Sequence, residues 1–373
     1  MTAGDRFASL DGWRAVAITL VLLSHTWATN NPPQVPAWLL PLMSQGDLGV
    51  RIFFVLSGFL ITTLLIAEHA RYGDISLRNF YVRRALRIFP VYYLYLLVLA
   101  VLQALSLTSE AFSSWAGSLT YTRNMFGRGD SATGHLWSLA VEEQFYLVWP
   151  AALVALGLCR RWQLAIGILL AIALMAIVVR AAGCTGDTFL CQRLLGHKSA
   201  LRYADTLAVG CIGAFLRANM ALQLPHGVRV AMLYGSMAAL VMLSGLTWSN
   251  PVMTSAVVTA QAVVIMASIG LSMTTRETVL FRLLNSRLAV FVGAISYSLY
   301  IWHVLFLSHY IMGPGISGSL LHDGRVWWLP AIIVAAFSYF AFERRIIALK
   351  DRLQTKRVPL PAQCHLQKTQ PAP

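Results

Sequence analysis

Charged side chains are scarce in this sequence. They make up 12% of its 373 residues, whereas soluble globular domains contain about 25%. This scarcity excludes a protein whose surface faces water throughout. Hydrophobic residues supply 57% of the chain, and they gather in runs long enough to cross a bilayer. The sequence therefore predicts an all-α, polytopic membrane protein whose core is formed by helices packed side by side.

Cysteine is also scarce, and no repeat or soluble domain is visible. None of the five cysteines shows metal-ligand spacing, so we predict no metal site. Cys184 and Cys191 share one polar link, where they either pair in an oxidising compartment or remain thiols. The net charge of +14 comes from basic residues in short links between apolar runs. This placement is typical of membrane topology and argues against a nucleic-acid partner.

About ten membrane spans are predicted, separated by Pro- and Gly-rich links. Most Lys and Arg residues fall in links on one side, which predicts that both termini are cytoplasmic. We expect an integral membrane domain over residues 1–345 in the lipid bilayer and a polar cytoplasmic tail over 346–373. The predicted spans are 14–30, 47–67, 88–106, 136–158, 164–182, 203–219, 230–247, 252–272, 288–310 and 326–342.

The first span carries two titratable residues, Arg14 and His25. Eleven helical positions advance about 1100°, about 20° beyond three turns, and rise about 16 Å. Both side chains therefore project from the same face, with Arg14 at the inner surface and His25 near the middle of the bilayer. An ionisable group at that depth is costly unless it has a partner or lines a cavity, so His25 is a candidate functional residue.

A basic cluster, "YVRRALRIFP", precedes the third span. Arg84 and Arg87 are three residues apart and share a helix face. Guanidinium groups on one face can bind phosphate oxygens through paired hydrogen bonds. The alternative is that the cluster anchors the inner end of the span against anionic lipid.

The segment "GHLWSLAVEEQFYLVWP" places two carboxylates near the start of an apolar span. Glu142 and Glu143 point about 100° apart, so they do not both face one cavity. We expect at least one to be paired, with Arg51 as a candidate, or to lie in a wet cavity. An interhelical ion pair and a catalytic role remain equal alternatives. In the Arg51 segment, we expect the small pair Ser57-Gly58 to allow close helix packing.

Further polar groups enter the membrane region from the outer side. In "ISYSLYIWH", Tyr297, Tyr300 and His303 lie on one helix, and the last two are spaced to share a face. An aromatic belt explains the tyrosines but not His303. Asp205 in "RYADTLAVG" enters from the same side, and the alternative roles for it are pairing with Arg202 or capping a helix.

Together, five segments resemble acyltransferase family 3, a family of integral membrane acyltransferases. In order, they are "SLDGWRAVAITLVLLSH", "RIFFVLSGFLIT", "RRALRIFPVYY", "LWSLAVEEQFYLVWP" and "ISYSLYIWH". The resemblance runs from about Ser9 to Arg345. It implies transfer of an acyl group, usually acetyl, from cytoplasmic acyl-CoA to a hydroxyl, commonly on a cell-envelope glycan. It also implies a bacterial inner-membrane location.

The resemblance assigns roles to several residues. The family's Arg-x10-His pair corresponds to Arg14 and His25, and its Arg-x-x-Arg motif to Arg84 and Arg87. Many members have an acidic residue where this chain has Arg51. Some members continue into a soluble esterase-like domain, which we expect this chain to lack because it ends shortly after "FERR".

These observations lead to one leading hypothesis about the site. Arg14, Arg84 and Arg87 bind acyl-CoA, and His25 acts as general base or carries the acyl group, with Arg14 and Glu142 also catalytic. We predict that acceptor-binding residues approach from the outer side and meet the donor in one continuous polar cavity. The alternatives are a small acceptor such as a macrolide, or a transporter without catalysis. The predicted acceptor-binding residues are Arg51, Glu143, Asp205, Tyr297 and His303.

Overall fold

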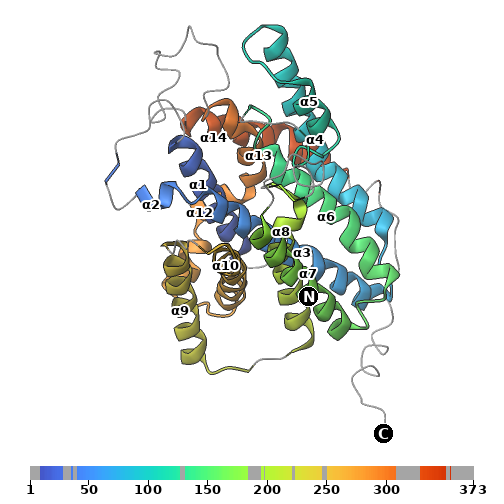
Figure 1. Cartoon of the computed structure of the whole chain (residues 1–373), viewed down its shortest axis with the longest axis vertical. Helices are drawn as coiled ribbons and strands as arrows, with labels where there is room; N and C mark the ends of the chain where they lie inside the picture. The colour runs from blue at the N-terminus through green and yellow to red at the C-terminus, as the bar shows by residue number, and fades with distance from the viewer. Residues whose placement is uncertain are drawn as a thin grey trace.

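Every secondary-structure element in the described residues is a helix, as the sequence predicts. The computed structural model is shown in Figure 1. Cys184, Cys191 and most of the predicted tail lie outside the described residues. The structure describes residues 9–27, 35–36, 40–126, 131–183, 195–196, 198–220, 223–245, 250–307, 328–349 and 353.

Long helices dominate the chain, joined by short turns and a few short helices. Two of them contain an internal proline, Pro90 in α4 and Pro150 in α6. The elements are α1 Leu10–Trp27, α2 Leu40–Met43, α3 Gly46–Tyr72, α4 Leu77–Ala104, α5 Phe112–Leu119, α6 Leu136–Ala155, α7 Trp162–Ala182, α8 Ala200–Asn219, α9 His226–Gly245, α10 Pro251–Ser272, α11 Val279–Leu284, α12 Arg287–Ala294, α13 Ser296–Trp302, the 3₁₀ helix η3 His303–Leu305, α14 Trp328–Phe337, the π-helix η5 Ser338–Glu343 and α15 Arg344–Ile347.

Five of the described helices are long and apolar enough to cross a membrane: α3, α4, α7, α9 and α10. A sixth candidate is the broken span formed by α12 and the following 296–305 segment, which bends by 54°. The other predicted spans also overlap helices, but α1, α6 and α8 carry charged side chains that lower their hydropathy. The architecture is thus all-helical and multi-pass, while the count of ten spans stays a prediction.

Large apolar side chains cover the outside of the helices. Leu147 and Val148 of α6, for example, are 64% and 65% exposed. Such exposure would be unfavourable in water and is ordinary against lipid, where helix packing is driven by close fit rather than by burial.

Small residues allow a close contact between α3 and α8. A Cβ atom on Gly58 would lie 2.1 Å from the carbonyl oxygen of Leu207, and one on Gly210 would lie 2.2 Å from that of Val55. Both glycines are therefore required for the two backbones to touch, which confirms the packing role predicted for Gly58.

Helices α9 and α10 pack together away from α4 and α6, toward the lower left in Figure 1. The first helix, α1, packs against α3 and α12. Its Trp13 is buried, and the indole donates a hydrogen bond of 3.0 Å to Ser272 of α10. This arrangement brings α1, α3, α4, α6 and α13 together around the candidate site.

Candidate active site

A cavity of about 800 Å³, counting the space at its opening, lies between α1, α3, α4, α6 and α13. Its two ends differ in chemistry. One end carries arginines, and the other is closed mainly by aromatic and aliphatic side chains. The lining consists of Arg14, Val50, Phe53, Phe54, Leu56, Ser57, Leu60, Ile61, Arg84, Arg87, Ile88, Ser138, Leu139, Glu142, Tyr146, Ser296, Tyr297 and Tyr300.

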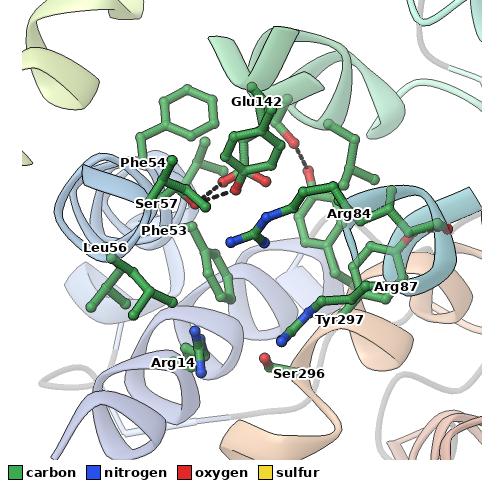
Figure 2. A pocket seen from close by; sticks show the side chains of 18 residues that line it. Arg14, Phe53, Phe54, Leu56, Ser57, Arg84, Arg87, Glu142, Ser296 and Tyr297 are labelled. Atoms are coloured by element: carbon green, nitrogen blue, oxygen red, sulfur yellow. Dashed lines mark hydrogen bonds between the residues drawn. The ribbon is translucent and has the colours of Figure 1, made fainter. Parts of the chain in front are cut away.

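Three guanidinium groups converge on the charged end (Figure 2). Arg84 and Arg87 come from adjacent turns of α4, and Arg14 comes from the first turns of α1. Arg14 is paired with Asp11 at 2.8 Å. In the described part of the chain, no carboxylate lies within 4.0 Å of the guanidinium nitrogens of Arg84 or Arg87. The cavity therefore presents more positive charge than its own residues neutralise.

Arg84 is held by aromatic rings rather than by a counter-ion. Its guanidinium carbon lies 4.9 Å from the centre of the Tyr146 ring and 5.9 Å from that of Phe80. Such stacking orients a guanidinium without consuming its N–H donors. The N–H donors of Arg84 are thus not used by this stacking, and the side chain lines the cavity.

Glu142 lies in the same cavity and belongs to a chain of hydrogen bonds. Tyr146 donates to the hydroxyl of Ser57 at 2.8 Å, and Ser57 donates to Glu142 at 2.7 Å. Figure 2 shows these contacts beside the arginines. Arg51 was a candidate partner for this carboxylate, and that pairing was wrong. Arg51 instead hydrogen-bonds Gln261 and lies 4.0 Å from Asp47. Ser57 takes that place because it projects from α3 toward α6.

The other end of the cavity is closed by Tyr300 and Ser138. Their hydroxyl groups lie 2.5 Å apart, and Tyr300 donates a 2.8 Å hydrogen bond to the carbonyl of His135. His25 is not among the lining residues. The predicted continuous cavity is therefore interrupted here, because the Tyr300 side chain occupies the space between the arginines and the histidines.

Three imidazoles meet beyond this wall. The ring of His303 lies 4.6 Å from that of His25 and 5.2 Å from that of His135, measured between centres. Tyr300 joins the wall to this group, since its ring lies 5.6 Å from His303 and 5.6 Å from His135. We call His25, His135 and His303 the imidazole cluster.

Backbone contacts indicate which ring nitrogen carries the proton in two of these histidines. Nδ1 of His25 lies 2.9 Å from the carbonyl of Val21, and Nδ1 of His303 lies 2.8 Å from that of Tyr300. Because a carbonyl only accepts, each Nδ1 is the donor. In a neutral ring, the lone pair is then on Nε2, which is the form that a general base requires.

The sequence comparisons assign the family. A family model described as an acyltransferase domain matches residues 7–342. The chain belongs to this acyltransferase family. Its family is one of acyltransferases, and five of its described helices are long and apolar enough to cross a membrane. The resemblance to acyltransferase family 3 is confirmed.

Several bacterial relatives carry O-acetyltransferase names. The peptidoglycan O-acetyltransferase OatA of Listeria monocytogenes is 33% identical over 190 residues, covering 46% of this chain and 28% of the relative. A putative O-acetyltransferase of Staphylococcus aureus is 27% identical over 327 residues, covering 80% and 50%. A putative peptidoglycan O-acetyltransferase of Bacillus subtilis, YrhL, is 36% identical over 163 residues, covering 39% and 23%.

The chain thus spans half or less of the length of these relatives. No solved structure matches it.

Five residues predicted for this acyltransferase site lie together in the cavity: Arg14, Arg84, Arg87, Glu142 and Tyr297. The hydroxyl of Tyr297 donates to the carbonyl of Ile88 at 2.7 Å, which fixes α13 against α4. Glu142 lines the cavity together with the arginines, in agreement with the expectation that one of the two glutamates lies in a cavity. It does so because it lies nearly two turns inside α6.

Besides His25 and His303, three further predicted site residues do not line the cavity. Asp205 is fully buried and pairs with Arg180 of α7, at 2.8 Å for each of two oxygen–nitrogen contacts, rather than with Arg202. Arg51 contacts Gln261, as described above. Glu143 is not among the residues that line the cavity, and its Oε1 has no hydrogen-bond partner among the described residues. Acceptor-binding roles for these residues remain predictions that the geometry does not support.

His135 is the residue that sequence reasoning missed. It immediately precedes α6 and is only 6% exposed. A signal was present in the sequence: an imidazole next to a long apolar run carries a desolvation cost similar to that of His25. Periodicity did not connect it with His25 and His303, because the three residues come from separate segments.

Proposed function

We propose that this enzyme is an inner-membrane O-acetyltransferase that moves an acetyl group from cytoplasmic acetyl-CoA to a hydroxyl of a cell-envelope glycan. The observation that carries the proposal is the cavity itself. Arginines without enough neighbouring carboxylates to neutralise them occupy one end of the cavity. At the other end, the Tyr300 side chain separates the cavity from the imidazole cluster. The names of the bacterial relatives support an envelope-glycan acceptor.

The charged end suits the nucleotide part of acetyl-CoA. That part carries several phosphates, and Arg guanidinium groups bind phosphate oxygens through two parallel hydrogen bonds. Arg14, Arg84 and Arg87 reach the same space from two helices. With the phosphates there, the pantetheine arm extends along the less polar part of the cavity, between Phe53 and Leu139. The thioester then lies near Tyr300.

Transfer requires the thioester to pass the Tyr300 wall. Tyr300 is held by two hydrogen bonds and by ring contacts, all of which a side-chain rotation would break. We propose that this rotation joins the cavity to the imidazole cluster when donor is bound. Until Tyr300 rotates, the closed wall would also keep water on the acceptor side away from the bound thioester.

The imidazole cluster then supplies acid–base chemistry. Nε2 of His25 removes the proton from the acceptor hydroxyl while the hydroxyl oxygen attacks the thioester carbonyl. A C–O bond forms, the C–S bond breaks, and the departing thiolate takes the proton from His25. General-base catalysis of this kind contributes a factor of about 10²–10⁴ in rate. An acyl group carried on His25 is the alternative route, with one additional step.

The membrane orientation is part of the proposal. With both termini cytoplasmic, the charged end faces the cytoplasm, where acetyl-CoA is made. The imidazole cluster then lies toward the outer side. A single cysteine near Gly134 should react with an impermeant reagent from outside, and single cysteines near Arg161 and Arg282 from inside. The opposite pattern would favour a cytoplasmic acceptor instead.

The decisive test uses purified protein and separates donor binding from transfer. We expect His25→Ala to bind acetyl-CoA with unchanged affinity and to lose envelope-glycan acetylation in cells, measured as base-labile acetate. His226→Ala is the matched control, because His226 is about half exposed on α9. A well-expressed His25→Ala protein that acetylates normally would remove His25 from the mechanism. No acetyl-CoA binding or consumption by wild-type protein would favour a transporter.

A further inference from the structure

His135 and His303 are buried polar side chains with unused hydrogen-bonding capacity. His303 is fully buried, and its Nε2 has no hydrogen-bond partner among the described residues. Both ring nitrogens of His135 are in the same condition. Carbonyl groups of Ala132 and Ile301 lie near His135, but without the alignment of a hydrogen bond. Leaving such atoms unpaired is unfavourable, so each calls for an explanation.

The available donors and acceptors indicate what would satisfy them. Nδ1 of His303 faces a carbonyl, so its Nε2 is an acceptor in the neutral ring. A neutral His135 offers one N–H donor and one lone pair. Acceptor nitrogens do not bond to one another, so the cluster needs a ligand that both donates and accepts. A hydroxyl group does both.

A metal ion is a poor alternative occupant. Among the described residues, no group of three or more His, Cys, Asp or Glu side chains is placed to hold one.

The segment before α6 fixes His135 in place. Thr133 donates to Glu110 at 2.8 Å and accepts from Arg123 at 3.1 Å, and all three residues are buried. On its other side, the carbonyl of His135 accepts from Tyr300. The imidazole itself forms no capping hydrogen bond with α6. The backbone is thus held by neighbours, while the ring nitrogens have no hydrogen-bond partner among the described residues.

We propose that His135 and His303 bind a polyhydroxylated acceptor beside His25, with an N–H of His135 donating to the reacting hydroxyl oxygen and Nε2 of His303 accepting from a second hydroxyl. This inference rests on the proposed function and adds the residues that hold the acceptor. It assigns His135 a binding role that is separate from the proton transfer at His25. It also places the acceptor on the side of Tyr300 opposite the donor cavity.

The test compares two substitutions with opposite properties. His135→Phe keeps the ring that packs against Tyr95 at 5.4 Å and His303 at 5.2 Å but removes both nitrogens. His135→Asn loses the ring but keeps one donor and one acceptor. We expect Phe to lower glycan acetylation in cells roughly tenfold or more and Asn to retain clearly more activity than Phe. The acetyl-CoA affinity of both purified variants should match that of wild type.

The outcomes separate this inference from the proposed function. Near-normal acetylation by His135→Phe, with His25→Ala inactive, would overturn the acceptor site and leave the proposed function standing. Activity that is higher for Phe than for Asn would show that only the shape of the ring matters and would also overturn it. Should the Phe variant fail to bind acetyl-CoA, His135→Leu serves as the second apolar variant in the same comparison. If the wild-type protein does not bind acetyl-CoA, the proposed function itself is overturned.

Discussion

Arginines in two regions of this protein differ in how completely neighbouring carboxylates neutralise them. Arg180 of α7 is only 8% exposed and makes two contacts of 2.8 Å with Asp205, and it also donates to Thr259 at 2.7 Å. Arg84 and Arg87 line a cavity and have no salt bridge to the described residues. Arg180 with its partners joins α7, α8 and α10, whereas Arg84 and Arg87 lie beside the cavity.

The difference separates a buried, paired arginine that stabilises the protein from cavity arginines that are open to a ligand. Removing charges from water is costly, and full pairing with good geometry offsets most of that cost. The Arg180 group meets this condition with its own residues. The Arg84 group does not, so a phosphate-bearing ligand would complete it. The following substitutions test this comparison, from the largest expected free-energy change to the smallest.

Breaking the Arg180–Asp205 pair should have the largest effect on stability. Asp205→Ala leaves a buried guanidinium without its carboxylate, and we expect a loss of about 3–5 kcal/mol in the free energy of unfolding. Unfolding in detergent micelles measures this change. The double variant Arg180→Met, Asp205→Leu should recover most of the loss. If Asp205→Ala keeps its stability but loses acetylation, Asp205 binds the acceptor, as predicted from the sequence.

Substituting the cavity arginines should weaken donor binding without destabilising the protein. Arg84→Ala and Arg87→Ala each remove a charge-assisted contact worth about 1.5–3 kcal/mol, or roughly 10- to 100-fold in acetyl-CoA affinity. The free energy of unfolding should change little, because the lost stacking of Arg84 on Tyr146 is offset by removing repulsion between neighbouring arginines. Lys should restore little, since it lacks the planar fork.

The control for these arginines is Arg217→Ala. Arg217 also stacks on an aromatic ring, Phe59 at 5.9 Å, but lies outside the cavity. Its substitution should leave acetyl-CoA affinity unchanged. If Arg84→Ala and Arg87→Ala bind acetyl-CoA as well as wild type does, the cluster is a lipid anchor instead.

Within the paired group, Thr259 should make a smaller contribution. Its hydroxyl donates to Asp205 at 2.6 Å and accepts from Arg180. Thr259→Val keeps the shape and removes these contacts, so we expect a loss of about 1 kcal/mol in the free energy of unfolding. Acetyl-CoA affinity should not change. An effect on acetyl-CoA affinity that exceeds the effect on stability would connect the two arginine groups.

This comparison also shows what sequence reasoning reached. Helix periodicity placed Arg84 and Arg87 on one face, and motif resemblance joined them to Arg14 in a donor site. These arguments work because residues three or four apart on one helix are neighbours whatever the tertiary fold. The membrane setting added a second constraint, since titratable groups in apolar runs need partners.

Partners on different helices could not be predicted in the same way. Arg180 ends an apolar run without any mark that it faces Asp205, and Ser57 looked like a packing residue although it donates to Glu142. His135 joins His303 only because α6 and α13 meet. Such contacts depend on the crossing of helices, which the spacing of residues within one helix does not encode.

The smallest predicted effect concerns Glu142, the one carboxylate that lines the cavity. Its negative charge opposes the phosphates that the arginines attract, so Glu142→Gln should tighten acetyl-CoA binding by about 0.3–1 kcal/mol, or a few-fold. Gln still accepts the hydrogen bond from Ser57, which keeps the geometry. Ser57→Ala, which removes that contact but not the charge, is the control and should not tighten binding. Titration with acetyl-CoA at two salt concentrations measures the effect, which should shrink as salt screens the charges. Weaker binding in Glu142→Gln would mean that the carboxylate positions the arginines, so that the cavity would resemble the paired Arg180 group more closely than this comparison allows.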